Sequence, residues 1–220
     1  MTTTLLVATN NRGKLAELHE LLSDLPLTLV TLQDVGVDFT VEETGHTFAE
    51  NAVLKAEAYA KASGLWTLAD DSGLEVDALG GSPGVYTARY GAPDAKTDRD
   101  RYSLLLWNMG GVPWDTRTAR FHAAVALAHP GRPTQTFDGI LEGYIALAPR
   151  GSGGFGYDPV FYVTSHNCHL AELPPEVKNA ISHRGRAVAA ARPALAAIAG
   201  TGQKDVLVLR WTDRVDPARD

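Results

Sequence analysis

The alternation of apolar and polar residues along the chain predicts strands and helices that follow one another closely. Short, β-rich apolar runs at residues 4–8 and 27–31 flank a segment beginning at Lys14 in which leucines recur on one helical face. A strand, a helix and a strand of these lengths predict a right-handed βαβ unit. The capping box at residues 47–50 opens a longer helix, which we expect to end at Gly64.

The second half of the chain favours antiparallel strands. Residues 118–127 alternate between apolar and polar positions, and residues 134–141 follow the turn HPGRP, so this pair predicts a hairpin. We expect the remaining elements to be strands at 66–69, 159–163 and 206–211, helices at 97–109, 175–181 and 186–199, and a loop at 80–93. This order predicts an α/β fold with a mixed sheet, in one domain that has two lobes around a cleft.

Composition and charge narrow the classes of function. The 220 residues are 45% hydrophobic, enough for a substantial core, and the formal net charge of −6 argues against non-specific binding to nucleic acid. The single cysteine, Cys168, cannot form an internal disulfide, which favours a reducing compartment. No apolar run approaches the ~18 residues of a membrane span, and the N-terminus lacks the basic region of a signal peptide. We therefore expect a cytoplasmic protein.

The turn TNNRGK at residues 9–14 joins the first predicted strand to the first helix and is suited to binding phosphate. Such a turn presents backbone N–H groups and the positive end of a helix dipole. Gly13 permits close approach, while Asn10 and Lys14 add side-chain donors. The motif is not a Walker A loop, because Leu15 stands where a magnesium-binding Ser or Thr would be needed. The alternative is a solvated helix start with an asparagine as its N-cap.

Acidic residues after the third predicted strand are candidates for binding a divalent metal. The sequence DDSG at residues 70–73 follows a strand end, where open α/β sheets bind ligands. Successive side chains on a strand point to opposite faces, so only one of the two aspartates would face a site there. Glu42 or Glu43 could supply a second carboxylate, and two or three such oxygens with substrate phosphates suit Mg²⁺. The alternatives are an ordinary polar turn and a solvated acidic loop.

Two clusters nearer the C-terminus combine aromatic rings, glycines and donors. In GSGGFGYDP, residues 151–159, Phe155 offers a stacking face and the glycines let the backbone approach a flat ligand. Lys178, His183 and Arg184 place three donors within seven residues, an arrangement suited to a phosphate or a carbonyl edge. The alternatives are a flexible loop over packed aromatics and a surface helix junction.

The second predicted helix carries a further cation. Lys55 lies in mid-helix, with Asn51 one turn earlier on the same face, and either residue could simply be solvated. His122 and His129 lack the spacing of metal ligands, which argues against zinc.

Six segments, taken together and in order, carry a likeness to a known family. They are TNNRGK (9–14), EETGHTFAENAVLKA (42–56), ADDSGLEVDALGGSPGVYTARYG (69–91), ARFHAAVAL (119–127), GSGGFGYDPVF (151–161) and KNAISHRGRA (178–187). In these segments the chain resembles the inosine triphosphate pyrophosphatase family, and above all the bacterial enzymes that act on XTP, dITP and ITP. The resemblance implies an elongated mixed sheet flanked by helices around a central cleft, in a single domain over residues 1–200. Residues 201–220 depart from the family pattern, and we expect them to be a C-terminal extension.

The resemblance also implies a role for each candidate residue. Asp71 would bind Mg²⁺ and act as the proton acceptor for water, and Glu42 would be the second metal carboxylate, with Glu43 as a close competitor. The turn would hold the triphosphate with help from Lys55, and the two later clusters would clamp the base and read its carbonyl. The implied substrate-binding residues are Thr9, Asn10, Asn11, Arg12, Gly13, Lys14, Lys55, Ser72, Phe155, Gly156, Tyr157, Asp158, Lys178, His183 and Arg184.

The reaction that the resemblance implies is hydrolysis of deaminated purine nucleoside triphosphates to the monophosphate and pyrophosphate, which would cleanse the nucleotide pool. Because the family is usually homodimeric, we expect a second copy of the chain as partner. The net charge and the lack of a long apolar run predict neither nucleic acid nor a membrane as partner. Two alternatives stay open. One is a pyrophosphatase for other modified nucleotides, and the other is a nucleotide sensor without turnover.

Overall fold

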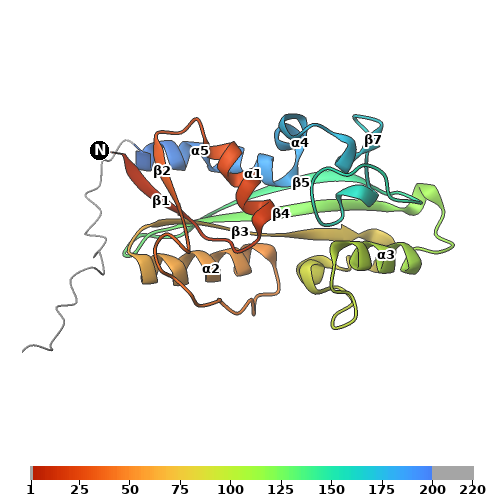
Figure 1. Cartoon of the computed structure of the whole chain (residues 1–220), viewed down its shortest axis with the longest axis horizontal. Coiled ribbons are helices and arrows are strands. Elements are labelled where there is room, and N and C mark those ends of the chain that lie inside the picture. Colours follow the sequence, from red (N-terminus) through yellow and green to blue (C-terminus); the bar gives the residue numbers. More distant parts are fainter. Residues whose placement is uncertain (1, 200–220) are drawn as a thin grey trace, which may run out of the picture.

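The computed structural model describes residues 2–199, and their strands form one mixed sheet of seven strands (Figure 1). The order across the sheet is β2-β1-β3-β4-β5-β6-β7. The strands are β1 (Thr3–Val7), β2 (Leu27–Thr31), β3 (Trp66–Val76), β4 (Thr118–Ala128), β5 (Gln135–Ile145), β6 (Phe161–Val163) and β7 (Cys168–His169). β2, β1 and β3 are parallel and the remaining pairs are antiparallel, which confirms the predicted α/β fold and the predicted hairpin.

Helices cover both faces of this sheet (Figure 1). They are α1 (Arg12–Leu22), α2 (Phe48–Ser63), α3 (Asp98–Asn108), α4 (Pro175–Ile181) and α5 (His183–Ala199). Alternate residues of β1 divide between two cores, as the two-residue period of a strand requires. Leu5 packs with Leu18 of α1 and Val188 of α5, whereas Leu6 packs with Ala52 of α2. The parallel βαβ unit is therefore enclosed on both sides, and its loops are left to build a site.

The third strand is longer than the sequence predicts. The expected strand at 66–69 ends in a turn at Asp70, but β3 continues in register with β4 through Val76. The prediction was wrong because the ladder with β4, in which Asp70 lies opposite Val125, supplies the backbone hydrogen bonds that a turn would otherwise provide. The two aspartates therefore stand within a strand, on opposite faces of the sheet.

Other boundaries differ by a few residues. α5 begins at His183 rather than at residue 186, because the hydroxyl of Ser182 accepts a hydrogen bond from the backbone N–H of Gly185. The predicted strand 159–163 is limited to Phe161–Val163, and the two-residue β7 was not predicted. The predicted strand at 206–211 and the proposed extension lie outside the described residues. Within residues 2–199, no helix has both the length and the apolar character needed to cross a bilayer.

Candidate active site

An open edge of β3 sets the position of the site. β1 pairs with β3 from Leu5 to Val7, opposite residues 66–68, and then turns away into residues 9–14. β3 continues beyond this point along β4. The carboxyl end of β1 therefore leaves room beside residues 70–73, at the kind of strand end where α/β sheets bind ligands.

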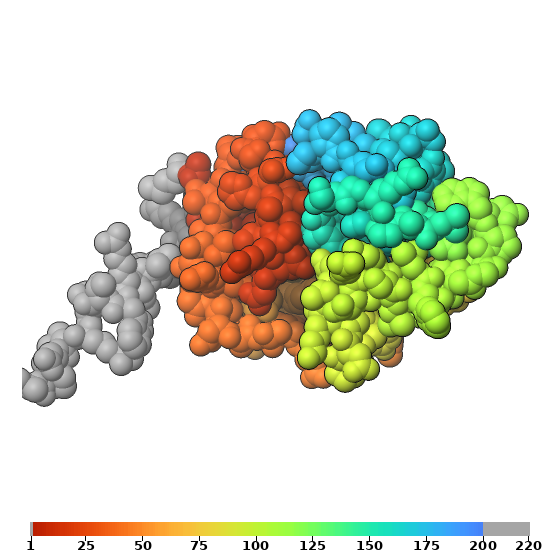
Figure 2. Space-filling view, turned by 45° about the vertical axis from the view of Figure 1, so that its right-hand side comes forward, coloured from red at the N-terminus to blue at the C-terminus, as the bar shows by residue number. Residues whose placement is uncertain are grey.

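A cavity of about 500 Å³ fills this room. Figure 2 shows a recess between the red N-terminal segment, the yellow-green segment near residue 98 and the teal glycine-rich loop. Its volume lies in the range typical of small-molecule sites. Lys14, Asp71 and Phe155 all line it, so segments far apart in the sequence share one cavity.

The turn that follows β1 both lines the cavity and supplies the N-cap of α1. The side chain of Asn11 accepts hydrogen bonds from the N–H groups of Gly13 (2.9 Å) and Lys14 (3.1 Å). The N-cap alternative is therefore correct for Asn11, and a phosphate would have to compete with Asn11 for those two donors. Arg12 is exposed and does not line the cavity, in contrast to the side chain of Lys14.

Gly13 is needed for close packing, because its missing side chain leaves room for the ring of Phe155. A Cβ at this position would lie 2.6 Å from the ring of Phe155, so only glycine lets the turn pack directly against the glycine-rich loop. Like Arg12, Gly13 is not among the residues that line the cavity. The packing of Phe155 on Gly13 holds the glycine-rich loop against the turn at residues 9–14.

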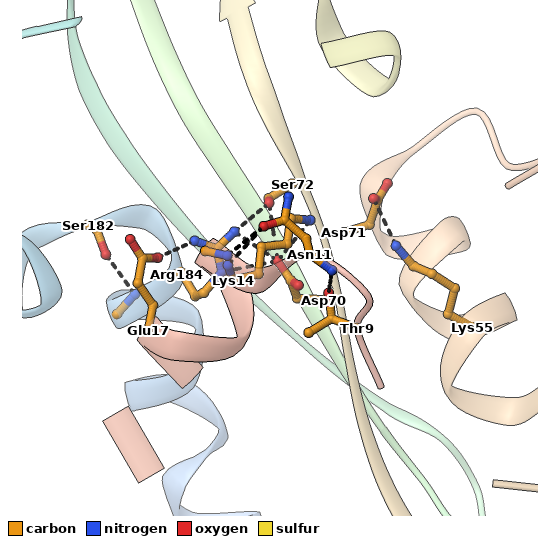
Figure 3. Close-up of polar contacts among 12 residues, drawn as sticks. Thr9, Asn11, Lys14, Glu17, Lys55, Asp70, Asp71, Ser72, Ser182 and Arg184 are labelled. Atoms are coloured by element: carbon orange, nitrogen blue, oxygen red, sulfur yellow. Dashed lines mark hydrogen bonds and ion pairs between the residues drawn. The ribbon is translucent and has the colours of Figure 1, made fainter. Parts of the chain in front are cut away.

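A buried ion network occupies the face of β3 to which Asp70 points (Figure 3). One carboxylate oxygen of Asp70 accepts hydrogen bonds from Nη2 of Arg184 (3.0 Å) and Oγ of Ser72 (3.1 Å), and it lies 3.3 Å from Nζ of Lys14. Arg184 is 1% exposed. Burial opposes ionisation of Asp70, but Lys14 and Arg184 outweigh it and hold the pKa of Asp70 well below its ordinary value.

The same network continues through Glu17 of α1. Glu17 forms an ion pair with Arg184 and a second with Lys178, whose Nζ lies 2.6 Å from Oε1 of Glu17. Lys178 also contacts Oδ2 of Asp158 at 2.5 Å. Burial alone would lower the pKa of Lys178, but Asp158 and Glu17 raise it above its ordinary value. Charges of alternating sign therefore run from the turn to the glycine-rich loop, and they hold Lys178 and Arg184 in fixed positions.

The opposite face of β3 carries a smaller cluster around Asp71 (Figure 3). Nζ of Lys55 lies 3.0 Å from Oδ1 of Asp71 and 2.7 Å from Oε1 of Glu43. Nδ2 of Asn51 donates to Oδ2 of Asp71 at 3.2 Å. Burial raises the pKa of Asp71 above its ordinary value, against the opposing effect of Lys55. Asp71 is therefore a stronger proton acceptor than an exposed aspartate.

The glycine-rich loop is fastened on both sides of the cavity. Its Gly156 N–H donates to Oδ2 of Asp98 at the start of α3 (2.8 Å), and the hydroxyl of Tyr157 donates to the carbonyl of Thr87 (3.0 Å). Lys178 Nζ lies 4.9 Å from the centroid of the Phe155 ring, within cation–π range. Tyr157 is buried, so the loop presents the ring of Phe155 more openly than that of Tyr157.

His183 is the first residue of α5 and lines the cavity. Its ring stacks on Phe121 at 4.7 Å, and its buried Nδ1 has no hydrogen-bond partner among the described residues. Burial, together with the charge of Arg184, keeps the pKa of His183 well below its ordinary value. The imidazole is therefore neutral at physiological pH, with one nitrogen able to donate and the other able to accept.

The structure brings most of the predicted site residues together and adds others. Apart from Arg12 and Gly13, every candidate lines the cavity. Glu17 and Asn51 were assigned no role from the sequence, and Asp70 was considered only as one of two aspartates that could face a site, yet all three hold the predicted residues in place. The spacing of Glu17, three residues after Lys14 on α1, could have placed it beside that lysine. Asp98 follows from no local pattern, because it reaches a residue 58 positions away.

The cluster around Asp71 fits a hard divalent cation such as Mg²⁺. The ammonium group of Lys55 touches both Asp71 and Glu43, so the two carboxylates already converge on one cation. Within residues 2–199, no group of three or more His, Cys, Asp or Glu side chains forms a cage for a metal. Mg²⁺ needs no such cage, since it is usually bound by one or two carboxylates, substrate phosphates and water. Glu42 lines the same cavity, but the ion pairs of Lys55 run to Glu43 and Asp71.

Comparison with known proteins agrees with this geometry. The sequence pattern of the Ham1 family matches residues 5–194. A dITP/XTP pyrophosphatase of Geobacter sulfurreducens is 52% identical over 187 residues, which cover 85% of this chain and 94% of that protein. The dITP/XTP pyrophosphatase of Bacillus subtilis is 48% identical over 183 residues, 83% of this chain and 92% of that protein.

Solved structures give the same result. A HAM1 protein from Coxiella burnetii superimposes with a TM-score of 0.79 at 43% identity, covering 88% of this chain and 98% of the other. A nucleoside-triphosphatase, dITP/XTP pyrophosphatase, from Mycobacterium abscessus gives a TM-score of 0.70 at 43% identity, covering 87% and 100%. The resemblance found in the six sequence segments is confirmed, and the chain belongs to the Ham1 family.

Proposed function

We propose that this chain hydrolyses deaminated purine nucleoside triphosphates, such as XTP, dITP and ITP, between the α- and β-phosphates, and releases pyrophosphate. The observation that carries the proposal is that the turn at 9–14, the cluster around Asp71 and the glycine-rich loop line one cavity. Relatives that cover most of the chain at about half identity bear the name dITP/XTP pyrophosphatase, which supports the same reaction.

At the phosphate end, Lys14 and Lys55 offer ammonium groups and Asp71 offers a carboxylate. We infer that Asp71 and a glutamate of the 42–43 pair hold Mg²⁺, and we favour Glu43 because its carboxylate lies against Lys55. The ion would neutralise charge on the phosphates when it is bound. Lys55 keeps its positive charge, because Asp71, Asp70 and Glu43 outweigh burial and raise its pKa. The two lysines would then orient the polyphosphate.

Asp71 is the group best suited to accept a proton from the attacking water. It lines the cavity, and burial raises its pKa above the ordinary value, which makes it a stronger proton acceptor than an exposed aspartate. Its two oxygens are oriented by Lys55 and Asn51, and each oxygen retains a further lone pair for a water molecule.

At the base end of the cavity, the available groups are mainly hydrogen-bond donors, which suit a carbonyl oxygen. Lys178 uses two of its three N–H groups on Asp158 and Glu17. We infer that the third N–H of Lys178, with Arg184 and neutral His183, reads the 6-oxo group that inosine and xanthosine carry and adenosine lacks. A polar mismatch in a buried site discriminates strongly. Stacking on Phe155 would hold the base against these donors.

The direct test incubates the purified protein and Mg²⁺ with ITP, XTP, dITP, ATP or GTP, and measures pyrophosphate and orthophosphate separately. We expect pyrophosphate from the first three and little product from ATP and GTP. Orthophosphate as the primary product would place cleavage at the γ-phosphate and contradict the proposal. Pyrophosphate from another modified nucleotide alone would change the substrate class. Binding without any product would identify a sensor.

Two further expectations rest on the resemblance and on composition. We expect a homodimer, which light scattering on the purified protein tests, and a cytoplasmic location, which agrees with the single cysteine.

A further inference from the structure

A buried amide stands directly behind the cluster around Asp71. Asn51, in the first turns of α2, is 0% exposed and is not among the residues that line the cavity. Its Nδ2 donates to Oδ2 of Asp71 at 3.2 Å, and its Oδ1 accepts the backbone N–H of Gly45 at 2.8 Å. Burying an amide is unfavourable unless its groups are paired, and these two contacts pair both ends of Asn51.

The two contacts fix which way the amide faces. The N–H of Gly45 requires an acceptor, so the oxygen of Asn51 must point towards the loop and its NH₂ group towards Asp71. A flipped amide would set two oxygens against each other at Asp71 and two donors against each other at Gly45. Asn51 therefore gives Asp71 a donor that cannot rotate away, which restricts the carboxylate to one orientation.

The same region of α2 also holds the loop that carries Glu43. Oε2 of Glu50 accepts the N–H groups of His46 (2.6 Å) and Thr47 (3.1 Å), beside the bond from Gly45 to Asn51. Three successive backbone N–H groups of the loop are thus held by two adjacent side chains of one helix. A Cβ at residue 45 would lie 2.7 Å from Oδ1 of Asn51, so the loop approaches the helix as closely as glycine permits.

We propose that Asn51 is a positioning residue, which holds Asp71 in the orientation needed to receive a proton and anchors the loop that brings Glu43 to the same cation. The inference rests on the proposed function, since it assigns Asn51 a task in that reaction. Asn51 does not line the cavity, and it acts through its contacts with Asp71 and Gly45.

Two substitutions separate these two contacts. Asn51→Asp keeps an acceptor for the Gly45 N–H but replaces the donor to Asp71 with a carboxylate. Asn51→Leu has a similar volume and removes both contacts. We expect kcat to fall about 10- to 100-fold in both variants, the range found for groups that orient metal ligands. KM should change less than about threefold, because the cavity wall is intact.

The Mg²⁺ concentration for half-maximal rate distinguishes the two roles. It should rise about tenfold or more in Asn51→Leu, where the Glu43 loop loses its anchor, and it should not rise in Asn51→Asp. A readout independent of turnover is calorimetric binding of an α,β-imido analogue of ITP without divalent metal. Its Kd should stay within about threefold of the wild-type value. Thermal unfolding of each variant shows whether the measured protein is folded at the assay temperature.

Asn108→Ala is the matched control. Asn108 is an exposed asparagine of α3 that donates to the hydroxyl of Tyr90 and does not line the cavity. Its rate and Mg²⁺ requirement should match those of the wild type. An active wild type whose two folded Asn51 variants keep their kcat, or lose affinity for the analogue as much as they lose rate, contradicts the inference alone. A wild type that releases no pyrophosphate contradicts the proposed function, and the inference falls with it.

Discussion

Asp70 and Asp71 are neighbours on β3, yet the two faces of the sheet give them opposite properties. Asp70 is enclosed by Lys14 and Arg184, which hold its pKa well below the ordinary value in spite of burial. Asp71 faces the cavity, and burial raises its pKa above the ordinary value even though Lys55 opposes the shift. One residue of displacement along a strand therefore separates a carboxylate with a lowered pKa from one with a raised pKa.

The two faces of β3 differ in how their charged groups are paired. On the Asp70 face each buried cation has a carboxylate partner, because Glu17 and Asp158 complete the pairing of Arg184 and Lys178. Such a network fixes geometry, and removing one member leaves a buried charge without its partner. The cluster around Asp71 is smaller and opens to the cavity. We infer that the first face holds donors in place and that the second carries out the reaction.

The largest expected effect is on stability, from Asp70→Asn. This substitution leaves Lys14 and Arg184 without a buried counter-charge, and breaking a buried ion network typically costs about 3–5 kcal/mol. Urea unfolding of wild type and variant at pH 7 measures the difference. A loss below about 1 kcal/mol would mean that Asp70 does not hold the network together.

The next effect is on turnover, from Asp71→Asn. Removing the proton acceptor should lower kcat by about 10² or more. The variant should be no less stable than the wild type at pH 7. A raised folded-state pKa means that ionisation of Asp71 lowers the free energy of unfolding, and asparagine does not ionise. Wild-type turnover in a folded Asp71→Asn protein would defeat the assignment of Asp71 as the base.

A smaller effect should distinguish the two candidate metal carboxylates. Glu43→Gln should raise the Mg²⁺ concentration for half-maximal rate by about tenfold, while Glu42→Gln should leave it within about twofold. Pyrophosphate release measured over a Mg²⁺ series compares the two variants. The reverse order would restore Glu42 as the ligand that the family resemblance implies.

The most gradual effect is the pH dependence of stability. Because the folded-state pKa of Asp70 lies below its unfolded value of about 3.9, its stabilisation is complete above that pH and is lost as the pH falls towards the folded value. The stability difference between wild type and Asp70→Asn should therefore be constant from pH 5 to 7. It should shrink below about pH 3.9, by at most about 1.4 kcal/mol per pH unit. A difference independent of pH down to 2.5 would show that the charge of Asp70 is not its source.

The fold and most cavity residues could be predicted from the sequence because their signals are local. Short patterns predicted the turn at 9–14, the capping box at 47–50 and the hairpin, and the structure contains all three. The predicted third strand ends too early, because a run of Asp, Ser and Gly is typical of a turn and the sequence does not show the partner strand that extends it. The roles of Asp70 and Asn51 depend on contacts with residues distant in sequence, such as Arg184, which no local pattern contains.

The central claim is that water attacks the α-phosphorus of a nucleotide held in this cavity. Hydrolysis of ITP in water enriched in ¹⁸O, followed by mass spectrometry of both products, tests it most directly. We predict that the heavy oxygen appears in inosine monophosphate and that the released pyrophosphate is unlabelled. Label in the pyrophosphate would place the attack on the β-phosphorus and contradict the account.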